Sequence, residues 1–250
     1  MLRIRIDGEP PTTDQLAAGL LANYGHFTAM QVRARRVQGL DLHLSRLNTQ
    51  HQELYNTTLD TTAIPTLIRN ILGDEQDAAV RVIVFGPENP ELMVVARPPA
   101  PRPTTPQRLL SVDYQRPLPH VKHIGGFGQL LHGNRAKAAG YDDALLTTHD
   151  GRVIEGAIAN IAFFTRSGDI VWPDAAWLHG ISMQLLEQAL PSTRAVIRLA
   201  DLPEFQGAFL CNSIGVTPVT AIDTVTYDID ETALARVRAA LDAVPWDALD

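Results

Sequence analysis

The sequence of 250 residues contains a single cysteine, Cys211, and no long apolar stretch. One cysteine cannot form an intrachain disulfide, so a reducing cytoplasm is the expected setting. No segment approaches the roughly 18 consecutive apolar residues that a membrane helix needs. The first ten residues, MLRIRIDGEP, lack the apolar centre of a signal peptide. We therefore expect neither a disulfide-stabilised protein nor one with a membrane as partner.

Positive charge is also scarce. The formal net charge is −7 and the isoelectric point is about 5.6, which argues against nucleic acid as a partner and favours a small-molecule substrate. Of the 21 basic residues, only Lys122 and Lys137 are lysines. Arginine forms no imine, because its guanidinium stays protonated and delocalised. Imine chemistry would therefore fall to one of two side chains or to the amino terminus.

The apolar fraction of 45% is enough for a sizeable core, in one two-lobed body or in two small domains. Apolar periodicity and turn residues predict mixed hairpins with interspersed helices, which is typical of an α+β fold. Asp41 is expected to cap the second helix. Strands are predicted at 2–6, 27–32, 36–38, 79–85, 92–97, 108–114, 143–148, 158–165, 169–172, 195–199 and 208–212, and helices at 16–21, 41–54, 62–72, 129–139, 182–190 and 231–241.

Proline marks the predicted boundary between the lobes. The segment Arg97–Pro106 is proline-dense and cannot be helical. Pro117 and Pro119 follow and indicate a linker at residues 117–120. The prediction is thus a smaller lobe over residues 1–116 and a larger lobe over residues 121–250, with the ligand site between them.

Lys122 lies in the segment His120-Val121-Lys122-His123, just before Gly125-Gly126. A lysine beside two glycines can point into a cavity that the backbone approaches closely. The alternative on this segment alone is a surface lysine. The two histidines lack a neighbouring carboxylate or cysteine, so no metal site is expected.

Several downstream segments favour a lysine in a cavity over a surface lysine, because they follow Lys122 in order and at natural spacings. Together with His43-Leu44-Ser45-Arg46-Leu47, they resemble the class IV aminotransferase family, the fold-type IV pyridoxal-phosphate enzymes. That family includes branched-chain and D-amino-acid aminotransferases and aminodeoxychorismate lyase. The segments are Tyr141–Leu146, Asp150–Gly156, Ala159–Phe163, Leu178–Ser182, Phe209–Ser213 and Val216–Val219.

The resemblance implies that pyridoxal 5′-phosphate is the cofactor and that Lys122 forms a Schiff base with it. Glu155 would face the pyridine nitrogen, since a carboxylate there keeps the ring protonated and improves it as an electron sink. A strand-end carboxylate in water is the alternative for Glu155. The further residues that the resemblance assigns to the cofactor are Arg46, Asn160, Gly180, Ile181, Ser182, Asn212 and Ser213.

Two of these assignments, Ser182 and Arg46, have plainer alternatives. Ile181 and Ser182 would offer the phosphate their backbone amides at a helix start, where the dipole favours an anion. The Ser182 hydroxyl is equally well explained as a helix cap. Arg46 would supply a permanent positive charge, and a solvent-facing arginine on a helix is the competing interpretation. Cys211 is interpreted as a small core residue rather than a nucleophile.

The substrate side departs from the family pattern. Phe127 stands where branched-chain members have a tyrosine, and Phe85-Gly86-Pro87 replaces an arginine–glycine pair of D-amino-acid enzymes. Arg81 is similar in position to a substrate-side arginine. Tyr24 and Phe27 belong to a segment that is shorter than usual in the family. Tyr24, Phe27, Arg81 and Phe127 are therefore the candidate substrate residues.

The resemblance implies transamination between an amino acid and a 2-oxo acid by a homodimer. Two alternatives remain open. Lys122-His123 and Cys211-Asn212 also match the lyase version of the motifs, in which pyruvate is eliminated to give 4-aminobenzoate. The departures on the substrate side also fit a non-catalytic protein that binds the cofactor or a metabolite.

Overall fold

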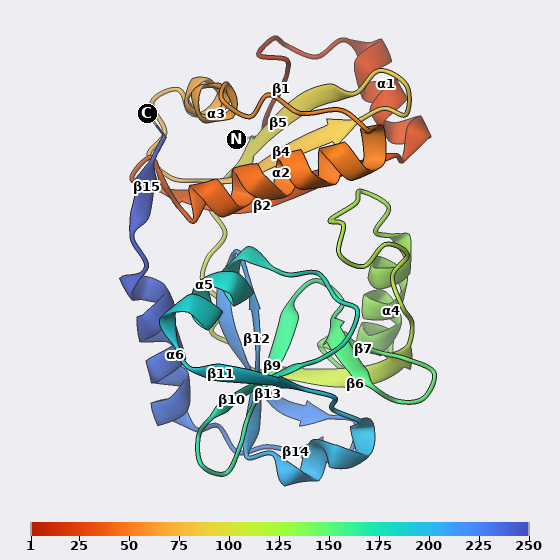
Figure 1. Cartoon of the computed structure of the whole chain (residues 1–250), viewed down its shortest axis with the longest axis vertical. Helices are drawn as coiled ribbons and strands as arrows, with labels where there is room; N and C mark the ends of the chain where they lie inside the picture. Colours follow the sequence, from red (N-terminus) through yellow and green to blue (C-terminus); the bar gives the residue numbers. More distant parts are fainter. Residues whose placement is uncertain (1, 250) are drawn as a thin grey trace. The chain divides into compact units, whose positions relative to one another are not determined.

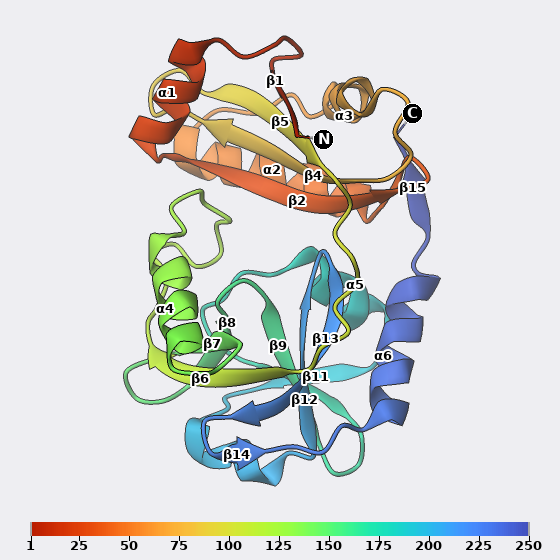
Figure 2. The same cartoon turned by 180° about the vertical axis from the view of Figure 1, so that it is seen from behind.

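The computed structural model describes residues 2–249, which form two compact units. The first unit contains the residues up to Pro101, the short segment Val121–Gly125 and the residues from Pro245 onward. The second unit contains Arg102–His120 and Gly126–Val244. Each unit combines one β-sheet with helices (Figure 1 and Figure 2). The predicted α+β fold class is confirmed.

The sheet of the first unit has six strands in the order β1-β5-β4-β2-β3-β15, and every neighbouring pair is antiparallel. Side chains of β2 and β4 alternate between buried and more exposed, as in a sheet with one face on a core. The predicted strands 27–32 and 36–38 form a hairpin, and the predicted strands 79–85 and 92–97 form an antiparallel pair. The C-terminal strand had no sequence signal. The strands are β1 (Arg3–Ile6), β2 (Gly25–Arg33), β3 (Arg36–Gln38), β4 (Ala78–Phe85), β5 (Glu91–Arg97) and β15 (Trp246–Ala248).

Three helices belong to the first unit. Two of them, α2 and α3, bury apolar side chains in one core cluster with the sheet. Helix α1 buries none of its residues. The helices are α1 (Thr13–Ala22), α2 (Leu40–Tyr55) and α3 (Ile64–Leu72).

The prediction that Asp41 caps α2 is wrong. The residue before the helix is Gly39, in a left-handed conformation with φ of 65°, and Asp41 lies within the first turn. The amide of Leu40 donates to Oδ2 of Asp247 at 2.9 Å. A carboxylate more than two hundred residues away thus satisfies the helix start. No local pattern signals such a contact.

The second unit contains a nine-stranded mixed sheet with the path β11-β10-β9-β12-β13-β6-β7-β8, and β14 pairs with β13. Strand β6 runs parallel to both of its neighbours, β13 and β7. The strands are β6 (Gln107–Asp113), β7 (Asp143–Thr147), β8 (Val153–Gly156), β9 (Asn160–Phe164), β10 (Ile170–Pro173), β11 (Ser192–Ala195), β12 (Gly207–Asn212), β13 (Gly215–Ile222) and β14 (Val225–Thr226).

The prediction of a strand over residues 195–199 is wrong in its bounds. Strand β11 ends at Ala195, Arg198 forms an isolated antiparallel bridge with Arg152, and a short 3-10 helix follows over Leu199–Glu204. The amide of Arg198 donates to Oδ2 of Asp201 at 2.8 Å, which stabilises the start of this turn. A carboxylate three residues on therefore outweighs the β-propensity of the apolar run.

Three helices complete the second unit: α4 (Phe127–Ala138), α5 (Ile181–Ala189) and α6 (Glu231–Ala243). Helix α5 packs against α6 and β12. The core of the unit is formed mainly by the inner side chains of the sheet, with Phe163 and Leu109 fully buried. No helix among residues 2–249 is long and apolar enough to cross a membrane.

The observed division of the chain differs from the predicted boundary at residues 117–120. Residues 107–113 belong to the second unit, because β6 pairs with β13 and β7. The segment around Lys122 belongs to the first unit, because Phe27 donates its amide to the carbonyl of Lys122 at 2.9 Å and Ile124 donates to Gly25 at 3.0 Å. Both departures arise from strand pairing between segments distant in sequence.

Candidate active site

Lys122 extends the sheet of the first unit beside the start of β2. His26 and His123 form an antiparallel bridge, so Lys122 stands opposite Phe27 and projects to the same face. Its Nζ lies 4.9 Å from the centroid of the Phe27 ring. The Lys122 amide donates to Oε1 of Gln50 on α2 at 3.1 Å. Backbone pairing and one side-chain contact thus fix the position of this lysine.

The predicted Arg46 lies on α2, one turn after His43. Burial and the positive charges of Arg46 and Lys122 lower the pKa of His43 to about 3, so this histidine is neutral. Its Nδ1 lies 2.5 Å from Oγ1 of Thr28. Burial lowers the pKa of the Arg46 guanidinium to about 10, which leaves it protonated at neutral pH. Two cationic side chains therefore surround a neutral histidine, an arrangement that suits an anion.

The candidate substrate residues fall into both units. Arg81 lies on β4 with its guanidinium carbon 5.4 Å from the Phe27 ring centroid, so Phe27 contacts both Arg81 and Lys122. The hydroxyl of Tyr24 donates to the carbonyl of Leu54 at 2.8 Å. Phe127 begins α4 of the second unit and is 75% exposed. The first unit thus brings together three of the four: Phe27 and Arg81 in direct contact, and Tyr24 at the start of β2.

Glu155 lies on β8 of the second unit and is buried. Its Oε1 lies 3.1 Å from Nη1 of Arg116, and both side chains are almost completely buried. The amide of Leu178 approaches Oε2 at 3.4 Å. A strand-end carboxylate in water is therefore not what the structure contains. Arg116, which precedes Pro117, was missed by sequence reasoning, because no local pattern links it to Glu155.

Asn160 and Gly180 lie in direct contact within the second unit. Nδ2 of Asn160 donates to the carbonyl of Leu178 at 2.7 Å. A Cβ added to Gly180 would meet Oδ1 of Asn160 at 2.1 Å, so any larger residue there would displace the Asn160 side chain. Gly180 also precedes the first turn of α5, and no side chain caps that helix start. The first amides of α5 thus follow a tightly packed turn.

Ile181 and Ser182 form that first turn, and both are buried. The hydroxyl of Ser182 donates to the carbonyl of Asn212 at 2.8 Å. Ser182 is therefore not the helix cap. Oδ1 of Asn212 accepts from the amide of Ile214 at 2.9 Å, and Ser213 lies in the turn between β12 and β13. The structure brings the start of α5 and the Asn212–Ser213 turn together.

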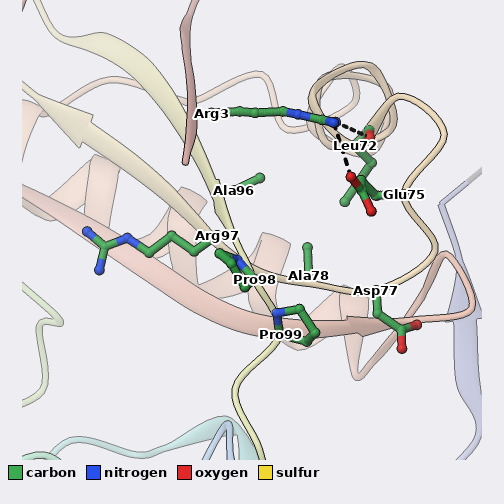
Figure 3. A pocket seen from close by; sticks show the side chains of 9 residues that line it. All are labelled: Arg3, Leu72, Glu75, Asp77, Ala78, Ala96, Arg97, Pro98 and Pro99. Carbon is green, nitrogen blue, oxygen red and sulfur yellow. Dashed lines mark hydrogen bonds and ion pairs between the residues drawn. The ribbon is translucent and has the colours of Figure 1, made fainter. Parts of the chain in front are cut away.

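A small pocket of the first unit, with a volume of about 120 Å³, lies at the other end of β4 from Phe85 (Figure 3). Arg3 forms an ion pair with Glu75 at 3.2 Å and donates to the carbonyl of Leu72. The guanidinium of Arg97 points away from Leu72 and Glu75 (Figure 3). None of the predicted site residues lines this pocket. Among residues 2–249, no group of three histidine, cysteine, aspartate or glutamate side chains is placed to hold a metal ion.

Comparison with known proteins gives one family and many similar folds. The family profile described as amino-transferase class IV matches residues 25–222. A hypothetical aminotransferase from Mycobacterium tuberculosis, in its pyridoxal-phosphate-bound form, has a TM-score of 0.81 at 20% identity, over 98% of each chain. The branched-chain aminotransferase of Escherichia coli has a TM-score of 0.82 at 16% identity, over 99% of each chain.

A third similar structure is a protein provisionally named 4-amino-4-deoxychorismate lyase, from Legionella pneumophila. Its TM-score is 0.79 at 19% identity, covering 88% of this chain and 91% of that one. A search of curated proteins finds no match. At these identities, the similar structures establish the fold.

Proposed function

This chain belongs to the class IV aminotransferase family, and on that premise we propose that it is a pyridoxal-phosphate-dependent enzyme that transfers an amino group between an amino acid and a 2-oxo acid. The observation that carries the proposal is the placement of Lys122. Strand pairing holds it beside β2, its amine lies next to Phe27, and both Lys122 and Arg46 lower the pKa of His43 by their charge. Lys137, the other lysine, lies in α4 of the second unit.

The residues present fit pyridoxal phosphate. A buried carboxylate, Glu155, suits a protonated ring nitrogen, and the uncapped start of α5 suits a phosphate. The turn at Gly180 leaves no room for a Cβ, as expected where backbone amides must approach a ligand closely. The bound cofactor would act as an electron sink for a carbanion at the substrate Cα.

Lys122 is assigned two roles. Its ε-amine would hold the cofactor covalently. Once free, the same amine would serve as general base and acid for the proton on Cα of the substrate.

Glu155 is assigned to the ring nitrogen. Nη1 of Arg116 lies 3.1 Å from Oε1 of Glu155, and an opposite charge at this distance favours the ionised carboxylate. An ionised Glu155 would favour a proton on the ring nitrogen of the bound cofactor. Asn160 binds the carbonyl of Leu178 and fixes the turn beside Glu155.

The phosphate is assigned to residues that present donors or positive charge: the amides of Ile181 and Ser182 and the guanidinium of Arg46. Asn212 and Ser213 would complete this side, since Ser182 binds the Asn212 carbonyl. Tyr24, Phe27, Arg81 and Phe127 are proposed for the substrate. The amino acid and the 2-oxo acid are then the proposed partners, in a cytoplasmic homodimer.

The second candidate is pyruvate elimination from aminodeoxychorismate. The Lys122-His123 and Cys211-Asn212 pairs match the lyase pattern, and one similar structure carries that provisional name. The same lysine and carboxylate serve either reaction, because both begin with proton removal and electron withdrawal into the ring.

One assay panel separates the candidates. The purified protein, supplied with pyridoxal phosphate, is given L- and D-amino acids with 2-oxoglutarate or pyruvate, and separately aminodeoxychorismate. Transamination predicts oxo-acid formation that Lys122→Ala abolishes and Lys137→Ala preserves. Formation of 4-aminobenzoate supports the lyase. A yellow protein without turnover on any substrate supports the non-catalytic alternative, and unchanged transamination by Lys122→Ala would contradict the assignment.

A further inference from the structure

The turn before α5 is held by a chain of polar and charged side chains that the proposed reaction does not use. His179 directly precedes Gly180, and its Nε2 lies 2.7 Å from Oε2 of Glu187. Arg194 on β11 donates to both carboxylate oxygens of Glu187, at 2.7 and 3.0 Å. The carboxylate of Glu187 thus links the turn to the edge strand of the sheet.

Three further contacts hold the same turn. The guanidinium of Arg194 lies 4.9 Å from the ring centroid of Trp177, and the Trp177 indole donates to the carbonyl of Pro173 at 2.6 Å. Nε2 of Gln184 donates to the carbonyl of His179 at 3.0 Å. The backbone of Trp177–Gly180 is therefore restrained at both ends of the turn.

The other side of the turn is held by Glu155 and Asn160. Leu178 offers its amide to Glu155 and its carbonyl to Asn160, at 3.4 and 2.7 Å. One peptide segment thus connects the carboxylate assigned to the ring nitrogen with the amides assigned to the phosphate. Its conformation sets how these two groups lie relative to each other.

Exposed ion pairs contribute little to stability, but this one differs from most. Arg194 binds Glu187 through a bidentate contact, and the Glu187 side chain is only 19% exposed. Bidentate arginine–carboxylate pairs add geometric specificity as well as energy. Such a chain is suited to fixing the direction of a backbone segment.

We infer that His179, Glu187 and Arg194 are positioning residues that hold the Trp177–Gly180 turn so that the first amides of α5 bind the phosphate of the cofactor. The inference rests on the proposed function, in which those amides bind the phosphate. It adds residues that touch neither the substrate nor the cofactor and act through the backbone of the turn.

The test compares two ligands that differ only in the phosphate. Dissociation constants for pyridoxal phosphate and for pyridoxal are measured by absorbance titration of the full-length protein freed of cofactor. The variants are Glu187→Ala and Glu187→Gln, the second of which keeps the side-chain volume. Asp150→Ala is the matched control, because Asp150 pairs with two arginines, Arg152 and Arg198, elsewhere in the same unit.

In Glu187→Ala, the dissociation constant for pyridoxal phosphate should be at least about tenfold higher than in the wild type. The dissociation constant for pyridoxal should be unchanged. Glu187→Gln should fall between Glu187→Ala and wild type, and Asp150→Ala should match wild type. Equal weakening of both ligands, or no change in either, would overturn the inference. If the wild-type protein bound neither ligand, the proposed function itself would fail. Should Glu187→Ala not fold, the Glu187→Gln comparison decides by the same criteria.

Discussion

Arg116 and Glu155 form an ion pair inside the second unit, with 3.1 Å between Nη1 and Oε1 and side-chain exposures of 4% and 6%. Removing two charges from water is costly, so such a pair is weak evidence for a stabilising role. Its presence is explained if the ionised carboxylate is needed for chemistry. Arg116 also donates to the carbonyl of Pro119 at 3.1 Å, which fixes the guanidinium in place.

Removal of one partner of this pair should destabilise the protein strongly. Arg116→Met removes the guanidinium that lies against the buried Glu155 carboxylate and should lower the free energy of unfolding by roughly 3–5 kcal/mol. The double variant Arg116→Met with Glu155→Met should regain most of that loss. Denaturant unfolding of the two single variants and the double variant measures the coupling. Additive losses would show that the two side chains do not depend on each other.

Glu155→Gln should preserve the fold but lower activity. A neutral amide cannot hold the proton on the ring nitrogen, so the ring withdraws electrons less well. We expect kcat to fall by about 10²-fold, as is typical when one charge-stabilising group is lost. Steady-state kinetics with cofactor at saturation measure the change. A kcat within twofold of wild type would remove Glu155 from the proposed role.

Two buried histidines should make the protein sensitive to acid. Burial and the neighbouring His51 lower the pKa of His26 to about 4, and that of His43 is about 3. Below pH 6.5 the unfolded chain binds protons that the folded chain excludes, so stability falls as the pH falls. Each histidine should reduce the free energy of unfolding by about 1.4 kcal/mol per pH unit between pH 6.5 and its folded pKa.

Urea unfolding between pH 4 and 7 measures this slope. Neither ring nitrogen of His26 has a hydrogen-bond partner, so His26→Phe should fold. The dependence of its free energy of unfolding on pH should be weaker by the contribution of one histidine. His149 is exposed and paired with Asp113, which raises its pKa, so its proton is bound in both states below pH 6.5. His149→Asn is therefore the control, with the wild-type slope. A slope unchanged in His26→Phe would disprove the contribution of His26.

Gly180→Ala should weaken cofactor binding. The added Cβ would lie 2.1 Å from Oδ1 of Asn160, so Asn160 must move and lose its bond to Leu178. We expect a stability loss of roughly 1–3 kcal/mol and weaker retention of pyridoxal phosphate, measured by dialysis and absorbance. Gly207→Ala is the control, because its Cβ would find ordinary contact with Phe164 at 3.5 Å. Equal retention in the two variants would contradict the role of the turn.

Local patterns were sufficient for most of the fold. Strand-like runs located β2 and β4, and the two runs on either side of Arg33–Arg35 located the hairpin, whose turn residues Ala34 and Arg35 both have positive φ. The start of α2 was mispredicted because its carboxylate comes from Asp247. The boundary between the units differs for a similar reason, since β6 finds its neighbours by long-range parallel pairing.

The candidate site shows the same division. Motif order predicts Lys122, Glu155 and Gly180 as site residues, because their proposed chemistry depends on residue type and spacing. Arg116 and the His179–Glu187–Arg194 chain carry no motif, because partners of a buried carboxylate or a braced turn are chosen by tertiary contact. Substrate choice is equally non-local, since it depends on a few side chains on loops.

The most direct test of the account is the position of the covalent bond to the cofactor. The protein is incubated with pyridoxal phosphate, reduced with borohydride, digested and mapped by mass spectrometry. We expect a phosphopyridoxyl label on the peptide that contains Lys122 and none on the peptide that contains Lys137. A label on Lys137 or the amino terminus, or no label, would contradict it.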